Sequence, residues 1–174
     1  MTTGTVLQLC ERVGFDVIIV ETVGVGQSEI EIDNVVDFVV HVIPPGSGDS
    51  LQGSKKGIME ISDLIVINKC DGDYVKACQR LQRSIQSSLT LSRLKHFEKN
   101  WFPPVELVSA LKNENIHKIW ENAQKFKNQL GDEYLQQRRN QQTQRGMWVY
   151  LGDAIMTRIK DYNDTSDNFK GLMG

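Results

Sequence analysis

The sequence predicts an α/β fold with a mostly parallel sheet, flanking helices and a helical extension at the C-terminal end. Runs of β-branched and other apolar residues, such as Leu64–Ile67, indicate strands that are covered on both faces, as parallel strands are. These runs alternate with helical stretches, which requires crossover connections. With 174 residues, 40% of them hydrophobic and 24% charged, the chain has the composition of one globular domain with a core.

The elements are expected in the following order. Thr2 or Thr3 caps a short first helix that ends at Gly14. Strands are predicted at 15–21, 36–43, 64–67 and 105–108, and helices at 54–62, 73–99 and 114–130.

After Gly131 the pattern changes to one long helical stretch over 132–161, weakened at Gly146 and Gly152 and followed by a frayed tail from Asn163. The sequence therefore predicts two parts. Residues 1–131 form the α/β part, and residues 132–174 form a helical extension that is a candidate dimerisation arm.

Composition argues against several classes of function. A net charge of −2 and a pI near 5.9 give no reason to expect nucleic acid as a partner. No apolar run approaches the roughly 18 residues of a membrane span. Three cysteines without a Cys-x-x-Cys pair, and three distant histidines, argue against a disulfide framework or a zinc site and for a reducing compartment. The first residues resemble neither a signal peptide nor a transit peptide.

The most informative motif is Asn68–Asp71 (Asn-Lys-Cys-Asp), directly after a predicted strand. Ligands of open α/β sheets bind at the carboxyl ends of strands. In this arrangement the Asp71 carboxylate accepts hydrogen bonds from N1–H and the 2-amino group of guanine, while Asn68 ties neighbouring loops together and the Lys69 stem covers the base. Adenine lacks that pair of donors, so the wrong base would leave a buried carboxylate unpaired.

A second motif, Ser109-Ala110-Leu111-Lys112, follows the last predicted strand. Its turn can supply a backbone N–H to guanine O6. Alone this signal is weak, but it gains weight from its order after Asn68–Asp71.

A third motif, Glu21–Gln27 (Glu-Thr-Val-Gly-Val-Gly-Gln), follows the first predicted strand. An acid at a strand end can hold the water shell of Mg²⁺, and the Gly24 N–H can sense a γ-phosphate. A dinucleotide-binding loop is the alternative. It lacks its third glycine, because Glu29 stands at that position.

Gly48 and Gly53 have the spacing of a Walker A loop, but the sequence rejects that interpretation. Walker A requires Lys and then Ser or Thr directly after the second glycine, whereas Ser54 precedes Lys55 here. The basic cluster of Arg138, Arg139 and Arg145 is interpreted as a solvated helix face.

The motifs at 21–29, 48–57 and 68–73, with Ser109-Ala110, Gln141-Gln142 and Met147-Trp148, resemble the MeaB/ArgK family of G proteins, which includes the methylmalonic aciduria type A protein. The resemblance implies part of a P-loop NTPase G domain of the SIMIBI class. It implies a GTPase, with GTP or GDP and Mg²⁺ as cofactors, that chaperones delivery of adenosylcobalamin to methylmalonyl-CoA mutase.

The resemblance also assigns residue roles. Glu21 and Gly24 belong to switch II, with Glu21 on Mg²⁺ through water, and Gln27 follows in the same motif. Asp49, Lys55 and Lys56 belong to a further switch loop. These six are the candidate catalytic residues. The guanine-binding candidates are Asn68, Lys69, Asp71, Ser109, Ala110 and Leu111. Ser50 stands where the family usually has an acid.

The resemblance places the family's P-loop and switch I before residue 1, so the chain is expected to be a fragment that neither hydrolyses GTP nor binds it tightly. A homodimer is expected for the full-length protein, and its location is the mitochondrial matrix in a eukaryote or the cytoplasm in a bacterium. A non-catalytic interaction module that keeps the switch loop and the long helix is the alternative function.

Overall fold

The computed structural model describes residues 3–22, 32–46, 60–92 and 94–171. Its sheet contains β1 (Val40–Ile43), β2 (Leu64–Ile67) and β3 (Val105–Leu107), in that order. Both pairings are parallel, with Val40 opposite Leu64 and Ile67 opposite Leu107. The predicted α/β class with a parallel sheet is confirmed.

The central strand β2 is buried along its whole length, because helices cover both faces of the sheet. Ile65 and Ile67 pack against the apolar face of α5 (Val75–Leu89). Leu64 and Val66 point to the opposite face and pack with residues next to and within α6 (His117–Leu130). This burial on both faces explains why β2 has four consecutive apolar residues rather than an alternating pattern.

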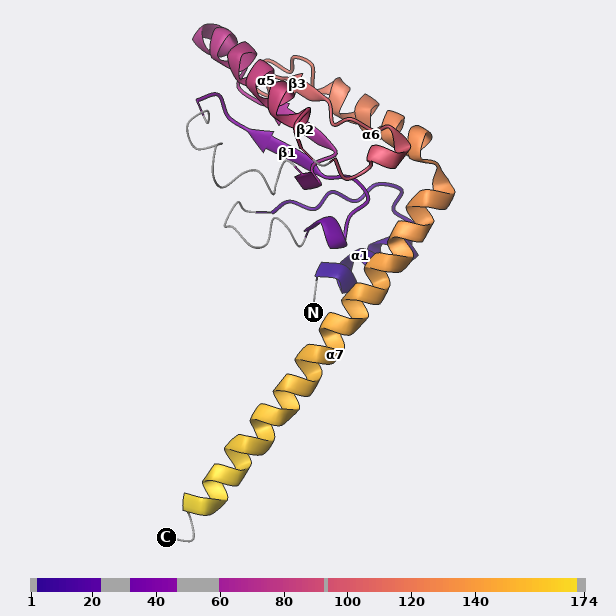
Figure 1. Cartoon of the computed structure of the whole chain (residues 1–174), viewed down its shortest axis with the longest axis vertical. Helices are drawn as coiled ribbons and strands as arrows, with labels where there is room; N and C mark the ends of the chain where they lie inside the picture. Colours follow the sequence, from indigo (N-terminus) through magenta and orange to yellow (C-terminus); the bar gives the residue numbers. More distant parts are fainter. Residues whose placement is uncertain (1–2, 23–31, 47–59, 93, 172–174) are drawn as a thin grey trace.

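The long helix α7 (Asp132–Gly171) leaves the core as a single rod (Figure 1). It begins after Gly131, whose φ of +80° suits glycine and turns the chain out of α6. Gly146 and Gly152 do not interrupt it. The backbone is helical up to Gly171, beyond the point where the frayed tail was expected, because extending an existing helix costs far less than nucleating one.

The strand predicted at 15–21 is wrong. Residues 15–22 form no strand in the structure, with a bend at Asp16, and the side chains of Phe15, Val17 and Ile19 are exposed. Within the described residues no neighbouring strand bonds to this segment, and an extended chain without a hydrogen-bonded neighbour is not a strand. The helix before it, α1 (Thr3–Val13), ends as predicted at Gly14, whose φ is +99°.

Two other elements are shorter than predicted because side chains take up backbone groups. β1 begins at Val40 rather than at Val36, since the Val39 N–H donates to the Asp63 carboxylate. α5 ends at Leu89, where the Thr90 hydroxyl bonds back to a carbonyl of the last turn. The predicted 73–99 helix therefore divides into the short 3₁₀ turn η2 (Gly72–Tyr74), α5 and the 3₁₀ turn η3 (Phe97–Lys99).

Of the helix predicted at 54–62, only residues 60–62 are described. Residues 60 and 61 are helical and Ser62 is not. No helix in the described ranges is both long enough and apolar enough to cross a membrane.

Candidate functional site

The two guanine-type motifs lie side by side at one edge of the sheet. β2 and β3 are parallel neighbours in register at Ile67 and Leu107, so both strands end at the same edge. Asn68–Asp71 continues from β2, and the Ser109 turn begins two residues after β3. The backbone holds the two loops together, since the Cys70 N–H donates to the Val108 carbonyl at 3.0 Å.

Side chains join the same two loops. The Ser109 hydroxyl donates a hydrogen bond to Asp71 Oδ2. Asn68 Oδ1 accepts from the Lys69 N–H at 2.7 Å and from the Ala110 N–H at 3.1 Å. The structure thus brings together five of the six residues expected to bind the base, with the half-buried Asp71 carboxylate held in place by Ser109.

Asn115, which the sequence analysis did not single out, supports this turn. Its Nδ2 donates to the Leu107 carbonyl at 3.0 Å, and its φ of +59° is in the left-handed region that Asn tolerates better than most residues. Ser109 and Glu114 exchange two backbone hydrogen bonds across the loop, at 3.1 and 2.9 Å. The Asn-Glu-Asn sequence at 113–115 was the available signal, since Asn is typical of such turns.

Lys69 has a backbone conformation that is unusual for its type, with a φ of +62°. A long side chain in the left-handed region costs roughly 1–2 kcal/mol. The bend turns the chain between Asn68, which faces the Ser109 loop, and the residues that lead into η2. Strain of this kind is concentrated at functional sites.

Cys70, which lies between Lys69 and Asp71 in the motif, is not a reactive thiol. Burial, together with the hydrogen bond and charge of the neighbouring Cys78, raises the pKa of Cys70 to about 12. Its Sγ donates to the Ile67 carbonyl at 3.1 Å. The side chain packs with the core and serves to fix the loop.

The other predicted site residues are not part of this group. Glu21 is exposed at the end of the 15–22 segment and reaches Asn68–Ala110 through no hydrogen bond or ion pair within the described ranges. Gly24, Gln27, Asp49, Lys55 and Lys56 lie outside the described residues. Leu111, next to Ala110, is 87% exposed.

The described residues also limit what metal chemistry can be assigned. They contain no group of three or more His, Cys, Asp or Glu side chains that could hold a metal ion. Mg²⁺ commonly keeps several waters and uses one or two carboxylates together with substrate phosphates. The exposed Glu21 carboxylate fits a role of that limited kind.

Two hollows in the described surface lie elsewhere. One of about 370 Å³ is next to the start of α7, and one of about 450 Å³ borders Lys95 and Phe97. Neither is lined by Asn68, Asp71 or Ser109. The chemistry of the sheet edge, not a cavity, therefore identifies the candidate site. This edge supplies an oriented carboxylate and an amide-rich turn, which suits a planar base with adjacent donors and an acceptor.

Comparison with solved structures places the fold in the class of P-loop nucleotide-binding proteins. A crystal structure described as that of an LAO/AO transport system kinase matches with a TM-score of 0.75 and 38% identity, over 88% of this chain and 48% of that chain. The family model described as methylmalonyl Co-A mutase-associated GTPase MeaB matches residues 1–164. The chain belongs to that family.

Curated relatives agree. The chain is 38% identical to the mitochondrial methylmalonic aciduria type A homolog of Mus musculus over 162 residues, which cover 92% of this chain and 39% of that protein. It is 47% identical to GTPase ArgK of Escherichia coli over 136 residues, which cover 78% of this chain and 40% of that protein. The chain therefore spans less than half of the length of these relatives.

Proposed function

We propose that this chain carries the guanine-recognising part of a GTP-binding and GTP-hydrolysing protein of the MeaB family. The supporting observation is the hydrogen bond from Ser109 to Asp71, at the edge where β2 and β3 end. A carboxylate held in one orientation can accept both guanine donors, and an adenine base would leave it unpaired. Relatives that are named GTPases support the same nucleotide.

Hydrolysis requires more than base recognition. By the family resemblance, the catalytic candidates are Glu21, Gly24 and Gln27 with Asp49, Lys55 and Lys56, and Mg²⁺ bound near Glu21 supplies charge neutralisation on the phosphates. Phosphates are normally held by backbone amides, a P-loop Lys and a Ser or Thr on Mg²⁺. We found no Walker A sequence in these 174 residues. We therefore propose that this chain alone binds GTP weakly and does not turn it over.

The test of base recognition uses a chimaera in which the N-terminal part of E. coli GTPase ArgK precedes residue 1. Asp71→Asn replaces an acceptor with a donor at the guanine edge. GTP affinity should fall about 10- to 100-fold, since a hydrogen bond to a charged group contributes about 1.5–3 kcal/mol. Affinity for xanthosine triphosphate should rise.

Asp73→Asn, which changes an exposed carboxylate two positions away, is the matched control and should leave both affinities unchanged. Calorimetry on the Asp71→Asn chimaera that showed the original GTP affinity would remove Asn68–Asp71 from the site. For the 174-residue chain by itself, a micromolar dissociation constant for GTP with Mg²⁺ would contradict the proposed weak binding.

The partner proposals rest on the family. We propose a methylmalonyl-CoA mutase as the protein partner, with a chaperone role in adenosylcobalamin delivery, because the matching family model is named for association with that mutase. We propose that the protein lies in the mitochondrial matrix if it comes from a eukaryote, because the mouse relative is named as mitochondrial, and in the cytoplasm if it comes from a bacterium. Co-purification with the mutase from the same organism, with and without GTP, tests this proposal.

A specific observation favours self-association through the extension, residues 132–174. Apolar side chains at helical spacing are exposed on α7, including Trp148, Leu151, Ile155 and Ile159. We propose that a second copy covers them in the full-length protein, so the extension works as the dimerisation arm. The same exposed helix supports the alternative function, a non-catalytic interaction module. Retention of mutase binding by a variant unable to bind GTP would favour that alternative.

A further inference from the structure

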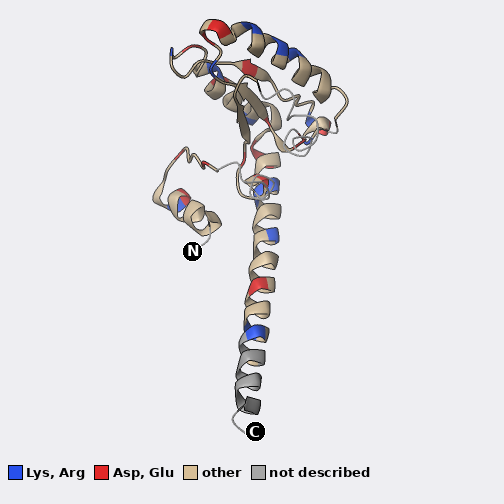
Figure 2. Cartoon of the chain, turned by 90° about the vertical axis from the view of Figure 1, so that its left-hand side faces the viewer, with Lys and Arg blue, Asp and Glu red and all other residues tan. Residues whose placement is uncertain are grey.

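Charged side chains from four separate segments meet where α7 passes the core. Lys95 Nζ lies 2.5 Å from Asp33 Oδ1 and 2.9 Å from Asp63 Oδ2, and Arg138 Nη2 lies 2.6 Å from the same Asp33 oxygen. The exposed fraction of the side chain is 14% for Lys95, 23% for Asp33, 0% for Asp63 and 11% for Arg138. We call these four residues the Asp33 junction. Figure 2 shows basic and acidic residues close together at this end of the long helix.

The junction also satisfies the backbone of residues 32–37. Arg138 donates to the carbonyl of Asp37 at 2.6 Å and to that of Asp33 at 3.2 Å. Gln142, one turn further along α7, donates to the carbonyls of Asp33 and Val36, both at 2.9 Å. This segment contains only the 3₁₀ turn η1 (Ile32–Asn34). The carbonyls of Asp33, Val36 and Asp37 therefore take partners from α7. These contacts correct the expectation of a solvated helix face for Arg138, whereas Arg139 and Arg145 are exposed as expected.

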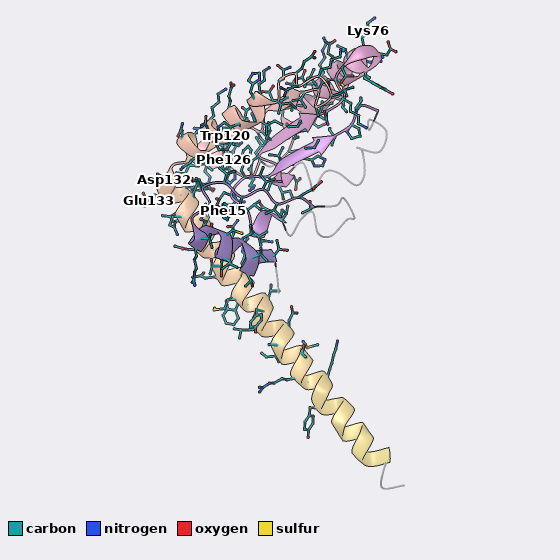
Figure 3. All side chains as sticks on the ribbon, turned by 180° about the vertical axis from the view of Figure 1, so that it is seen from behind. Phe15, Lys76, Trp120, Phe126, Asp132 and Glu133 are labelled. Carbon is teal, nitrogen blue, oxygen red and sulfur yellow. The ribbon has the colours of Figure 1, made fainter. Side chains whose placement is uncertain are left out.

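A second bridge lies beside the first. His96 Nδ1 and the Tyr134 hydroxyl of α7 are 2.9 Å apart, while His96 Nε2 lies 3.1 Å from Asp63 Oδ1 without the alignment of a hydrogen bond. The His96 ring also packs edge-on against Phe126, which Figure 3 shows at the base of α6 near the start of α7. The first turns of α7 thus contact His96, which faces Asp63, and are bound to Asp33 through Arg138.

We propose that Asp33 is a positioning residue that makes the docking of α7 depend on the conformation of residues 32–37. One carboxylate oxygen serves both Lys95 of the core and Arg138 of α7. Movement of residues 32–37 would break both contacts together and leave the largely buried Arg138 without a carboxylate, which is strongly unfavourable, while Lys95 would keep only Asp63. The two segments should therefore open and close as one unit.

This inference goes beyond the proposed function, because it concerns the protein without nucleotide. Residues 32–37 follow the Glu21–Gln27 motif closely in the chain, so a displacement there has a short covalent path to the junction. Opening of this kind is a local event with its own free energy, distinct from global unfolding. It can be measured whether or not the chain binds GTP.

The test is hydrogen exchange by mass spectrometry on the 174-residue chain and its Asp33→Asn variant. In the variant, exchange should rise about tenfold or more both at the Val35 and Val36 amides and over residues 133–146, because charged hydrogen bonds are lost on both sides of Asp33. Peptides from α5 should keep their protection. Asp37→Asn is the matched control, since it removes a carboxylate from the same segment whose ion pair with Arg139 is far more exposed. It should change exchange less than about threefold.

Several outcomes would overturn the proposal. The first is equal hydrogen exchange in Asp33→Asn and Asp37→Asn. The others are faster exchange in α7 without faster exchange at Val35 and Val36, or a uniform rise in exchange that includes α5. If Asp33→Asn does not fold, Arg138→Gln replaces it and must give the same paired loss. Arg138→Lys should restore only part of the protection, because a lysine cannot contact the Asp33 carboxylate and the Asp37 carbonyl with a planar fork.

Discussion

Asp63 is the buried charge on which the attachment of α7 and the start of the sheet both depend. Its side chain is fully buried just before β2. Oδ2 accepts from the Val39 N–H and from Lys95 Nζ, each at 2.9 Å, and Oδ1 faces His96. Asp63→Asn keeps the shape of the side chain and removes its charge, so it isolates the contribution of the carboxylate.

The expected loss is large. Removing one partner from a buried ion pair costs about 3–5 kcal/mol, because the remaining charge stays desolvated. In Asp63→Asn, Lys95 keeps Asp33 as a partner, which limits the loss of stability. The amide NH₂ of the new Asn, however, would face the Val39 N–H, Lys95 or His96, and two donors cannot bond to each other. For a chain of this length, about 2–4 °C of melting temperature per kcal/mol gives a decrease of roughly 6–20 °C.

Urea unfolding followed by circular dichroism measures the effect. Trp101 gives a second probe, because its Nε1 donates to the Asp63 carbonyl at 3.0 Å and its ring is buried. The control is Asp153→Asn on the exposed part of α7, where a change within about 0.5 kcal/mol is expected. If Asp63→Asn were less than about 1 kcal/mol more destabilising than this control, the carboxylate would not be a principal contact of the core.

Three further predictions follow from the described contacts. First, burial raises the pKa of Asp63, but His96, Lys95 and the Val39 N–H outweigh burial and hold the pKa below its usual value of 3.8. The stability that the Asp63 carboxylate contributes to the folded chain is therefore complete above about pH 3.8 and is lost as the pH falls through the lower pKa of the folded state. The stability difference between the wild type and Asp63→Asn should therefore shrink in acid, and a difference that stayed constant from pH 7 to pH 2 would contradict this. Second, burial and Cys78 raise the pKa of Cys70 to about 12, so iodoacetamide at pH 8 should modify the half-exposed Cys10 and spare Cys70 in the folded chain. Mass spectrometry measures the modification of each cysteine, and unfolding the chain in urea should abolish the difference. Third, Asn115→Ala should destabilise the chain by about 2 kcal/mol in urea unfolding, since the variant loses the hydrogen bond to the Leu107 carbonyl and places Ala at a φ of +59°. Asn115→Gly should recover the part of that loss that comes from the backbone conformation.

Part of the fold was predictable because the signal is local. The apolar run of β2 implies a strand buried on both faces, and Gly14 and Gly131 mark the ends of helices at which positive φ angles occur. The segment 15–21 has a similar apolar run and forms no strand, because strand formation also needs a hydrogen-bonded neighbour, which a local pattern does not encode.

The candidate site at the sheet edge was predictable for the same reason, since Asn68–Asp71 directly follows β2 and Ser109-Ala110 begins two residues after β3. Asn115 was missed because its contribution lies in a φ angle and one backbone contact. The role of Arg138 was missed because its partners, in residues 33–37, are about a hundred positions away in the sequence. A charge pattern on one helix gives no information about a partner so remote.

The two polar assemblies lie at opposite ends of β2, and this placement determines how they can influence each other. Asp63 precedes the strand at its amino end, and Asn68–Asp71 continues from its carboxyl end. The strand between them is bonded to β1 on one side and β3 on the other, and all four of its side chains are buried. A strand in that position cannot shift without unpairing both neighbours, which amounts to unfolding the sheet. The contacts of α7 with the core are made by α7 side chains, so the helix can detach while the Asn68–Asp71 and Ser109 loops keep their geometry. Loss of the Asp33 junction should therefore change the direction of α7 before it changes the geometry of the Asn68–Asp71 and Ser109 loops.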